Sequence, residues 1–173
     1  YITKKIDANY NSQAQCHTWQ NFLNDIFAGN QNMIRFVQKA IGYSLTGSTQ
    51  EQCIFILHGT GANGKSTFLT TIKELLGDYA QQSPSETLMA KKNGSNATND
   101  LARLKGARFV SSVETEEGRA FAEVLVKQLS GDDTITARFL HKEFFEFKPE
   151  CKIWLASNHK PRISGTDYAI WRR

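Results

Sequence analysis

The chain has 173 residues, 21 Lys and Arg against 17 Asp and Glu, a net charge of +4, and 40% hydrophobic residues. This length fits one ordinary domain with part of a second, and only 3 Pro and 12 Gly exclude collagen-like, low-complexity and wholly disordered chains. No apolar run approaches the ~20 residues that span a bilayer and no signal peptide opens the sequence, so we expect a cytoplasmic protein without a membrane partner.

Two amphipathic helices are predicted at the beginning of the chain. Apolar residues recur at helical spacing over 19–27, where Gly29 follows as a stop, and again over about 33–41. The stretch 44–50 contains Gly, Ser and Thr, which is typical of a linker. Two short helices cannot bury a core alone, so residues 1–50 are predicted either to pack on the rest of the chain or to belong to a helical domain that begins upstream.

From Cys53 onward, strands alternate with helices. A buried strand is predicted at 53–57, followed by a Gly-rich loop and a helix that ends at Gly77. The remaining elements are a polar connection at 81–100, a short helix at 99–105 ended by Gly106, a strand at 109–113, a helix at 120–129, a β-hairpin at 134–147 and a strand at 152–157. This alternation predicts an α/β fold with a mostly parallel central sheet.

The three cysteines, Cys16, Cys53 and Cys151, lie far apart and form no C-x-x-C pair. Such spacing favours neither a disulfide framework nor a zinc site. We expect three reduced, buried thiols.

Residues 59–66, the phosphate loop, read GTGANGKS and match the pattern G-x-x-x-x-G-K-[ST] between a predicted strand and a predicted helix. Glycines let the backbone wrap around phosphate oxygens, and a helix N-terminus adds the positive end of its dipole. Lys65 is expected to reach the β and γ phosphates, and the Ser66 hydroxyl to coordinate Mg²⁺. The residues expected to bind ATP are Gly59, Thr60, Gly61, Ala62, Asn63, Gly64, Lys65, Ser66 and Thr67. The alternative is a Gly-rich turn with an exposed lysine.

Three carboxylates follow the predicted strand at 109–113. A nucleotide hydrolase needs an acid that holds Mg²⁺ and a group that orients the attacking water, usually at the end of a neighbouring strand. Glu114 is the first candidate for the magnesium-side acid, and Glu116 or Glu117 for the catalytic base. Three acids in a surface loop can also be merely solvated.

The predicted strand at 152–157 is followed by Asn158. An amide at a strand end can hydrogen-bond both the γ-phosphate and the attacking water, which makes Asn158 a candidate catalytic sensor. An asparagine before Pro161 also suits a simple turn. We expect His159 to be structural or on the surface.

The order of these motifs resembles the superfamily III helicases, a branch of the AAA+ ATPases, and especially the primase-helicase proteins of phages, plasmids and large DNA viruses. The likeness covers about Cys53 to Arg173. It rests on the phosphate loop and on NDLARLKG at 99–106, KQLSGDD at 127–133, AR at 137–138, FKP at 147–149, SNHKP at 157–161, GTD at 165–167 and IWRR at 170–173. It implies a P-loop NTPase of AAA+ type, built as a three-layer sandwich. Residues 51–173 are then the ATPase core, truncated at its C-terminus, and residues 1–50 the C-terminal part of a helical domain.

The resemblance also assigns roles at the end of the chain. Such motors work as rings, usually hexamers, in which an arginine from the neighbouring subunit stabilises the transferring phosphoryl group; Arg172 is the first candidate here and Arg173 the second. One departure matters: Thr115 separates Glu114 from Glu116, where typical acids are adjacent, so the identity of the base stays open.

In this family a β-hairpin before the sensor strand grips single-stranded DNA. His141 and Lys142, at the tip of the predicted hairpin, are candidates for backbone-phosphate contact, while Arg138 and Lys127 either assist or hold the hairpin or the nucleotide site. Residues 119–173 hold 10 basic and 7 acidic side chains, which agrees with an anionic partner there. The phenylalanines nearby are expected to pack the hairpin rather than stack on bases: Phe139, Phe144, Phe145 and Phe147.

The function implied is an ATP-dependent DNA helicase or translocase in the replication of a phage or mobile element, in the cytoplasm of a bacterial host. Its partners would be single-stranded or forked DNA, copies of itself in a ring, and a primase domain or other replication proteins. One alternative is a DNA-binding or helicase-loader module that uses ATP as a switch without unwinding. A P-loop kinase would need an arginine-rich lid, and 81–100 contains no arginine.

Overall fold

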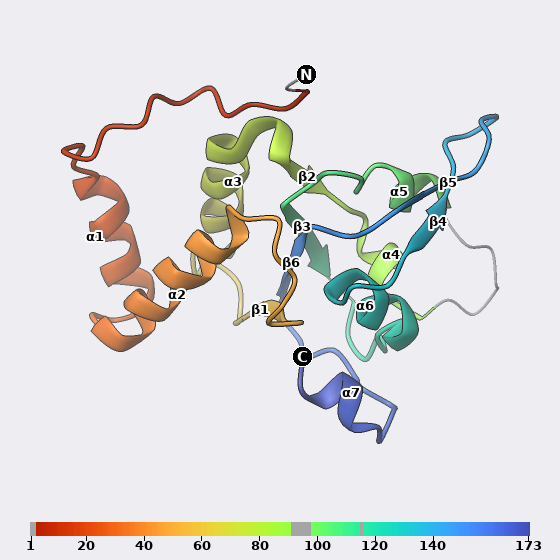
Figure 1. Cartoon of the computed structure of the whole chain (residues 1–173). Helices are drawn as coiled ribbons and strands as arrows, with labels where there is room; N and C mark the ends of the chain where they lie inside the picture. Colours follow the sequence, from red (N-terminus) through yellow and green to blue (C-terminus); the bar gives the residue numbers. More distant parts are fainter. Residues whose placement is uncertain (1–2, 91–97, 115) are drawn as a thin grey trace.

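The computed structural model describes residues 3–90, 98–114 and 116–173. Four parallel strands form the central sheet in the order β1-β6-β3-β2. Their bounds are β1 (Ile54–His58), β6 (Lys152–Ser157), β3 (Phe109–Glu114) and β2 (Ala80–Gln82). Helices cover both faces of the sheet, so the sheet is the middle of three layers (Figure 1). The predicted α/β fold with a mostly parallel sheet is confirmed.

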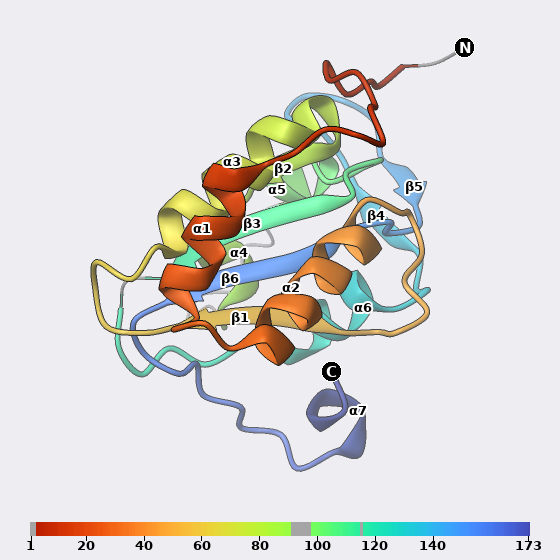
Figure 2. The same ribbon diagram turned by 90° about the vertical axis from the view of Figure 1, so that its left-hand side faces the viewer.

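The first layer consists of α1 (His17–Ile26), α2 (Gln31–Ser44) and α3 (Lys65–Leu76), which lie together on one face of the sheet (Figure 2). A short 3₁₀ turn, η1 (Gly77–Tyr79), follows α3. The buried side chains of this layer include Leu23, Ile34, Val37, Phe68, Ile72, Phe109 and Trp154. The two N-terminal helices therefore pack on the sheet, whereas the division into two domains at residue 50 stays a prediction.

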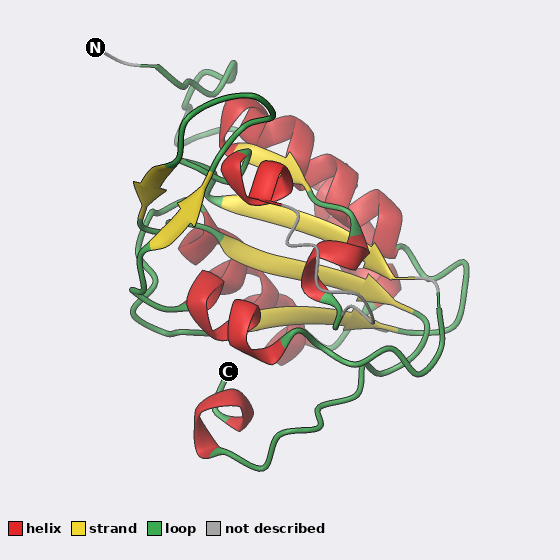
Figure 3. Ribbon diagram, turned by 90° about the vertical axis from the view of Figure 1, so that its right-hand side faces the viewer, coloured by secondary structure: helices red, strands yellow, loops and turns green. Residues whose placement is uncertain are grey.

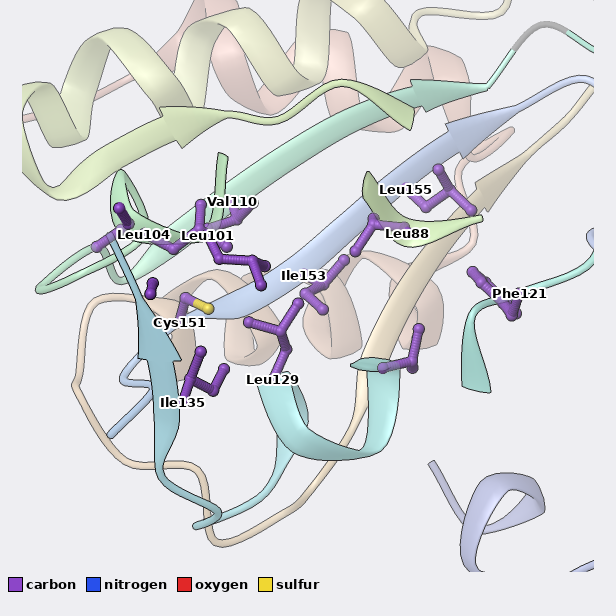
Figure 4. Close-up of a cluster of buried hydrophobic side chains, with 14 of the residues drawn as sticks. Leu88, Leu101, Leu104, Val110, Phe121, Leu129, Ile135, Cys151, Ile153 and Leu155 are labelled. Carbon is purple, nitrogen blue, oxygen red and sulfur yellow. The ribbon is translucent and has the colours of Figure 1, made fainter. Parts of the chain in front are cut away.

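The second layer covers the opposite face, which Figure 3 shows, with shorter elements. These are α4 (Ser85–Leu88), α5 (Thr98–Ala102), α6 (Glu123–Ser130), and the antiparallel hairpin of β4 (Ile135–Ala137) and β5 (Phe145–Phe147). Their apolar side chains meet those of the sheet in a second cluster (Figure 4), which includes Leu88, Leu101, Val110, Phe121, Leu129, Ile135, Ile153 and Leu155. The last helix, α7 (Tyr168–Trp171), contacts α6.

Residues 44–50, predicted as a linker, form a strap that is hydrogen-bonded to the sheet and to the segment that follows α6. The Lys152 ammonium donates to the carbonyls of Thr46 and Ser48, the latter at 3.1 Å, and Arg108 donates to the Leu45 carbonyl at 2.9 Å. The Thr49 hydroxyl lies 2.9 Å from an Asp132 carboxylate oxygen. These bonds fix how α2 approaches the sheet.

Three predicted boundaries are wrong. The helix predicted at 99–105 ends at Ala102. The polar connection at 81–100 contributes Gln81 and Gln82 to the edge strand β2 and also holds α4, while 91–97 lie outside the described residues. The helix predicted from residue 120 begins at Glu123, because Ala120 and Phe121 form bridges with other segments. Edge pairing through the backbone needs no apolar side chains, so β2 leaves no periodic signal.

The three cysteines are free thiols, but only one is buried. Cys16 is exposed, Cys53 is half-buried, and burial raises the pKa of Cys151 to about 11. The prediction of three buried thiols is therefore wrong for Cys16 and only partly right for Cys53. None of the described helices reaches the length and apolarity that a membrane span needs.

Candidate functional site

The site lies where three parallel strands end together. In the sheet register, Ser157 of β6 pairs with His58 of β1 on one side and with Glu114 of β3 on the other. The phosphate loop follows His58 and Asn158 follows Ser157, so both segments leave the same edge of the sheet, at the strand arrowheads in Figure 3. Because β6 lies in the middle, Asn158 emerges between the phosphate loop and Glu114.

A cavity of about 330 Å³ opens at this edge. It is lined by residues 61–67 of the phosphate loop and α3, by Val113 of β3, and by 156–158 at the end of β6. The structure describes the backbone of Glu114 beside Ser157, whereas the Glu114 side chain and Thr115 lie outside what is described. The cavity thus brings together seven of the nine predicted ATP-binding residues, those at 61–67, with the candidate sensor and the strand that carries the candidate acid; Gly59 and Thr60 do not line it.

The phosphate loop bends back on itself and is bridged by its own lysine. The Lys65 ammonium donates to the Gly59 carbonyl at 2.5 Å and to the Asn63 side-chain oxygen at 2.8 Å. Gly64 has a φ of +81°, a left-handed conformation that favours glycine, and helix α3 begins at the next residue. The cavity therefore has an ammonium group and a helix N-terminus on the same side, an arrangement that attracts anions.

A short turn aims Asn158 into the cavity. The Ser157 hydroxyl donates to the His159 carbonyl at 2.5 Å and accepts from the His159 backbone N–H at 3.1 Å. The turn is therefore closed by Ser157, and the Asn158 amide is not needed to form it. Asn158 is exposed and lines the cavity, which leaves its amide available to a ligand.

The two other candidate acids differ in their neighbours. Glu116 forms an ion pair with Arg119, with 2.8 Å between the charged atoms. The Glu117 carboxylate is 81% exposed and lies 4.0 Å from the His159 ring, next to the sensor turn. Backbone hydrogen bonds join the two loops: Arg162 donates to the Arg119 carbonyl at 2.9 Å, and Phe121 donates to that of Arg162 at 3.0 Å. Sequence reasoning missed this link, because the partners are about forty residues apart and carry no shared motif.

The predicted metal ligands comprise one hydroxyl and one carboxylate, and the side chain that carries the carboxylate, Glu114, lies outside the described residues. Among the described residues, no three His, Cys, Asp or Glu side chains are placed to hold an ion. The predicted ligands are the hydroxyl of Ser66, which lines the cavity, and the carboxylate of Glu114. A hydroxyl with one carboxylate suits Mg²⁺, which retains several waters and takes further ligands from substrate phosphates.

The candidate arginines lie at the opposite end of β1 from the phosphate loop. The Arg173 carbonyl accepts from the Ile54 backbone N–H at 3.2 Å, and its guanidinium donates to Ser130 at 2.8 Å and to the Lys127 carbonyl at 3.3 Å. Arg172 is exposed and bonds to the Gln52 side chain. Neither arginine reaches the cavity of its own chain.

Lys127 is engaged within the protein. Its ammonium lies 3.0 Å from the carboxylate of Asp167, which also caps α7 by accepting from the Ile170 backbone N–H at 3.0 Å. The hydrogen bond from the Lys127 ammonium has the larger effect, and together with that from the Ile170 N–H it lowers the pKa of the Asp167 carboxyl. Lys127 of α6 thus holds the residue that caps α7, a role that the sequence analysis did not assign, and its contact with DNA, the hairpin or the nucleotide site stays a prediction.

The hairpin extends from the end of the sheet opposite the cavity, as Figure 3 shows. Its tip is a turn in which the Lys142 N–H donates to the Phe139 carbonyl at 3.0 Å, with His141 at a φ of +60°. Both predicted phosphate-binding side chains are exposed there, and the Arg138 guanidinium lies 4.6 Å from the Phe144 ring centre.

The phenylalanines of the hairpin differ in their exposure. Phe147 is buried as expected, but Phe139 and Phe144 are 44% and 56% exposed. Both rings still contact the hairpin, Phe139 by stacking on Phe145 at 5.8 Å between centroids and Phe144 through Arg138, so the expected packing is observed, with part of each ring left exposed.

Comparison with known proteins places this chain in a family. Residues 57–173, more than half of the chain, match the model of a family of unknown function, DUF5906. The chain belongs to this family. A protein of Acanthamoeba polyphaga mimivirus named "Putative helicase L207/L206" is 34% identical over 145 residues, which cover 83% of this chain and 15% of that protein. An African swine fever virus protein named "Putative primase C962R" is 25% identical over 126 residues, 72% of this chain and 13% of that protein.

The fold also matches that of a solved protein. The apo structure of the NrS-1 C-terminal region superposes with a TM-score of 0.66 over 89% of this chain and 36% of that chain, at 15% sequence identity. This likeness shows a shared fold. The DUF5906 chain thus spans only a minor part of each of these proteins, about 15% of the mimivirus relative.

Proposed function

We propose that this chain is the ATP-hydrolysing motor of a replicative DNA helicase, acting with Mg²⁺. The observation that carries the proposal is the cavity at the carboxyl ends of β1, β6 and β3, where the phosphate loop, Asn158 and the Glu114 backbone converge. The names of the mimivirus and African swine fever virus relatives support a helicase or primase-helicase context. The P-loop NTPase fold of AAA+ type is part of this proposal.

The contacts of the site suggest a division of labour. Lys65 would exchange its bonds to Gly59 and Asn63 for phosphate oxygens, since an ammonium gains more from an anion than from neutral acceptors. Ser66 and Glu114 would hold Mg²⁺, which supplies neutralisation of phosphate charge. Asn158 would orient the attacking water.

Glu117 is the better placed of the two candidate bases. Glu116 is ion-paired with Arg119, whereas Glu117 lies beside the turn that presents Asn158. A base must be able to accept a proton from water near the sensor, and a tightly paired carboxylate does so less readily.

The proposal includes a ring of identical subunits, with ATP between neighbours. Both terminal arginines lie away from the cavity of their own chain, as a residue that acts on a neighbour's ATP must. Arg173 is committed to internal partners and Arg172 is exposed, so Arg172 is the preferred finger. The resemblance to the superfamily III helicases is the basis for proposing a hexameric ring, a primase domain in the same protein, and a cytoplasmic location in a bacterial host.

The hairpin would hold single-stranded or forked DNA. His141 and Lys142 offer donors to backbone phosphates, and the exposed rings of Phe139 and Phe144 lie beside them. Cationic groups next to exposed aromatic rings are what sequence-independent binding of single strands uses. Lys127 is left out of this role because its ammonium is engaged with Asp167.

The test is ATP turnover with and without single-stranded DNA. We expect DNA to stimulate turnover and Lys65→Ala to lower it by at least about 100-fold. Lys73→Ala is the matched control, because Lys73 lies in the last turn of the same helix, away from the phosphate loop, and its ammonium donates to the Gln82 side chain. Full turnover in Lys65→Ala would contradict the motor. Nucleotide and DNA binding without any turnover, in the longer protein that contains this chain, would favour the ATP-switched loader instead.

A further inference from the structure

The two halves of the phosphate loop differ in what covers them. A methyl group placed on Gly61 would meet no other atom within 4 Å, whereas one on Gly64 would lie 2.7 Å from the Ile26 Cγ2 methyl and 3.1 Å from the Phe22 ring. The backbone just before Lys65 is therefore in contact with two apolar side chains of α1. Gly61 has no such cover, and Gly59 is covered only by the polar side chain of Asn63 from the loop itself.

The helix that provides this cover is itself anchored. Leu23, between the two contact residues, is fully buried in the first-layer cluster. The Trp19 ring packs against the Phe22 ring at 5.3 Å and against Phe68 of α3 at 5.6 Å between centroids. Helix α1 thus rests on α3, the helix that the phosphate loop begins, so Phe22 and Ile26 are held against Gly64 by the core.

We infer that Phe22 and Ile26 are positioning residues for the ATP site: they hold Gly64 in its left-handed conformation and so aim Lys65 and Ser66 at the phosphates. Glycine adopts positive and negative φ with similar ease, so the φ of +81° at Gly64 depends on its surroundings. Apolar cover on one side favours the conformation in which α3 starts at Lys65. This inference rests on the proposed nucleotide site and deepens it.

The contact between α1 and the phosphate loop has a second consequence, which follows from thermodynamic linkage. If α1 favours the loop conformation that binds phosphate, bound nucleotide must favour the docked position of α1 by the same factor. The N-terminal helices are then coupled to the nucleotide state, although neither lines the cavity.

The test uses a pair of substitutions at one position. Ile26→Ala removes the Cγ2 methyl that contacts Gly64, whereas Ile26→Val retains it and loses only the terminal methyl. We expect Ile26→Ala to weaken MgATP binding on the order of 10-fold, with kcat changed by no more than about twofold, and Ile26→Val to bind like the unmodified chain. Without nucleotide, amide hydrogen exchange at 64–66 should speed up in Ile26→Ala and stay unchanged at 59–62.

Val37→Ala is the matched control for general loss of stability. Val37 belongs to the same apolar cluster but lies on α2 and is 5% exposed. Equal MgATP binding in Ile26→Ala and the unmodified chain, or equal weakening by Val37→Ala, would overturn the inference. If the unmodified chain binds no MgATP, the proposed function fails, and the exchange rates measured without nucleotide still decide whether Ile26 positions the loop.

Discussion

The two layers that cover the sheet are built in different ways. The first has helices of 10, 14 and 12 residues around Trp154, whose ring stacks on Phe55 at 4.3 Å and meets Phe68 at 5.4 Å. The second has helices of 4, 5 and 8 residues and a hairpin of two three-residue strands. The short elements are nevertheless well buried: α6 buries Val126, Leu129 and Ser130, whereas the longer α1 buries Leu23 alone. The layers therefore differ in the length and regularity of their elements.

The difference corresponds to the tasks proposed for each layer. The first layer contacts the phosphate loop at Gly64, where a fixed backbone helps to bind phosphate. The second layer carries the exposed hairpin tip, and α7, packed on α6, carries Arg172; these are the groups proposed to reach DNA and a neighbouring subunit. A motor of this design would keep one side of its sheet rigid and present its external contacts from the other.

The largest effect is expected from removal of the central ring of the first layer. Trp154 is 1% exposed, and its ring N–H donates to the Ser44 hydroxyl at 3.0 Å. Trp154→Ala should lower the free energy of unfolding by about 3–5 kcal/mol, because it leaves a large cavity and removes one of the two hydrogen bonds of the buried Ser44 hydroxyl, which still donates to the Ala40 carbonyl. Denaturant unfolding followed by circular dichroism measures this.

The control for Trp154→Ala is Trp171→Ala on the other side of the molecule. Trp171 is 61% exposed and bonds to the Gly165 carbonyl at 2.9 Å. Its removal should lower the free energy of unfolding by less than about 1 kcal/mol. Similar losses from the two tryptophans would show that the burial of Trp154 does not make it the main support of the first layer.

A smaller effect is expected where the strap at 44–50 joins the first layer to the sheet. Burial lowers the pKa of Lys152 from 10.5 to about 8, next to Cys151, Cys53, Glu150 and Arg108. Between these two pH values the unfolded chain binds more protons than the folded one, so the contribution of Lys152 to stability rises with pH. Because backbone carbonyls favour the ammonium, we expect a rise of only about 1–2 kcal/mol.

Lys152→Met isolates this contribution. The free energy of unfolding of the unmodified chain, minus that of Lys152→Met, should increase from about pH 8 to about pH 10.5. Groups that titrate in this range without interacting with Lys152 are common to both proteins and cancel. Cys53 and Cys151 interact with Lys152, so both proteins are compared with these two thiols replaced by serine. A difference that is flat or falls with pH would show that the strap carbonyls, rather than burial, dominate the protonation of Lys152.

Local patterns predicted much of the fold. The strand at 152–157 was predicted with the bounds that β6 has, because its side chains are buried on both faces and give a continuous apolar run. The phosphate loop follows a strand and begins α3, as its motif requires. In both cases the determining residues are neighbours in the chain.

Contacts between distant segments could not be predicted in this way. The cover of Gly64 by Phe22 and Ile26 joins residues about forty positions apart, and a helical period shows only that one face of α1 is apolar. The same holds for the strap, whose polar sequence is typical of a loop but whose carbonyls are bound by Lys152 and Arg108. Sequence periodicity identifies a buried face without identifying its partner.

The smallest effect is expected at the hairpin tip, the most exposed part of the second layer. Lys142→Ala should weaken binding of single-stranded DNA on the order of fivefold at about 0.15 M salt and reduce the salt dependence by about one counterion, because one phosphate contact is lost. Lys148→Ala is the matched control, since Lys148 is exposed but lies beyond β5, away from the tip. Fluorescence anisotropy at several salt concentrations measures both quantities.

His141 needs a different substitution, because its φ of +60° is part of the turn. His141→Gly retains that conformation at no steric cost and removes only the imidazole, so a loss of affinity reports the lost side chain rather than a changed turn. We expect a loss of about twofold, smaller than that of Lys142→Ala, because the lysine ammonium offers three donors on a long side chain and the imidazole fewer on a short one. If Lys148→Ala weakens DNA binding as much as Lys142→Ala, the DNA contact is spread over the whole basic surface of the second layer and is not made by the tip.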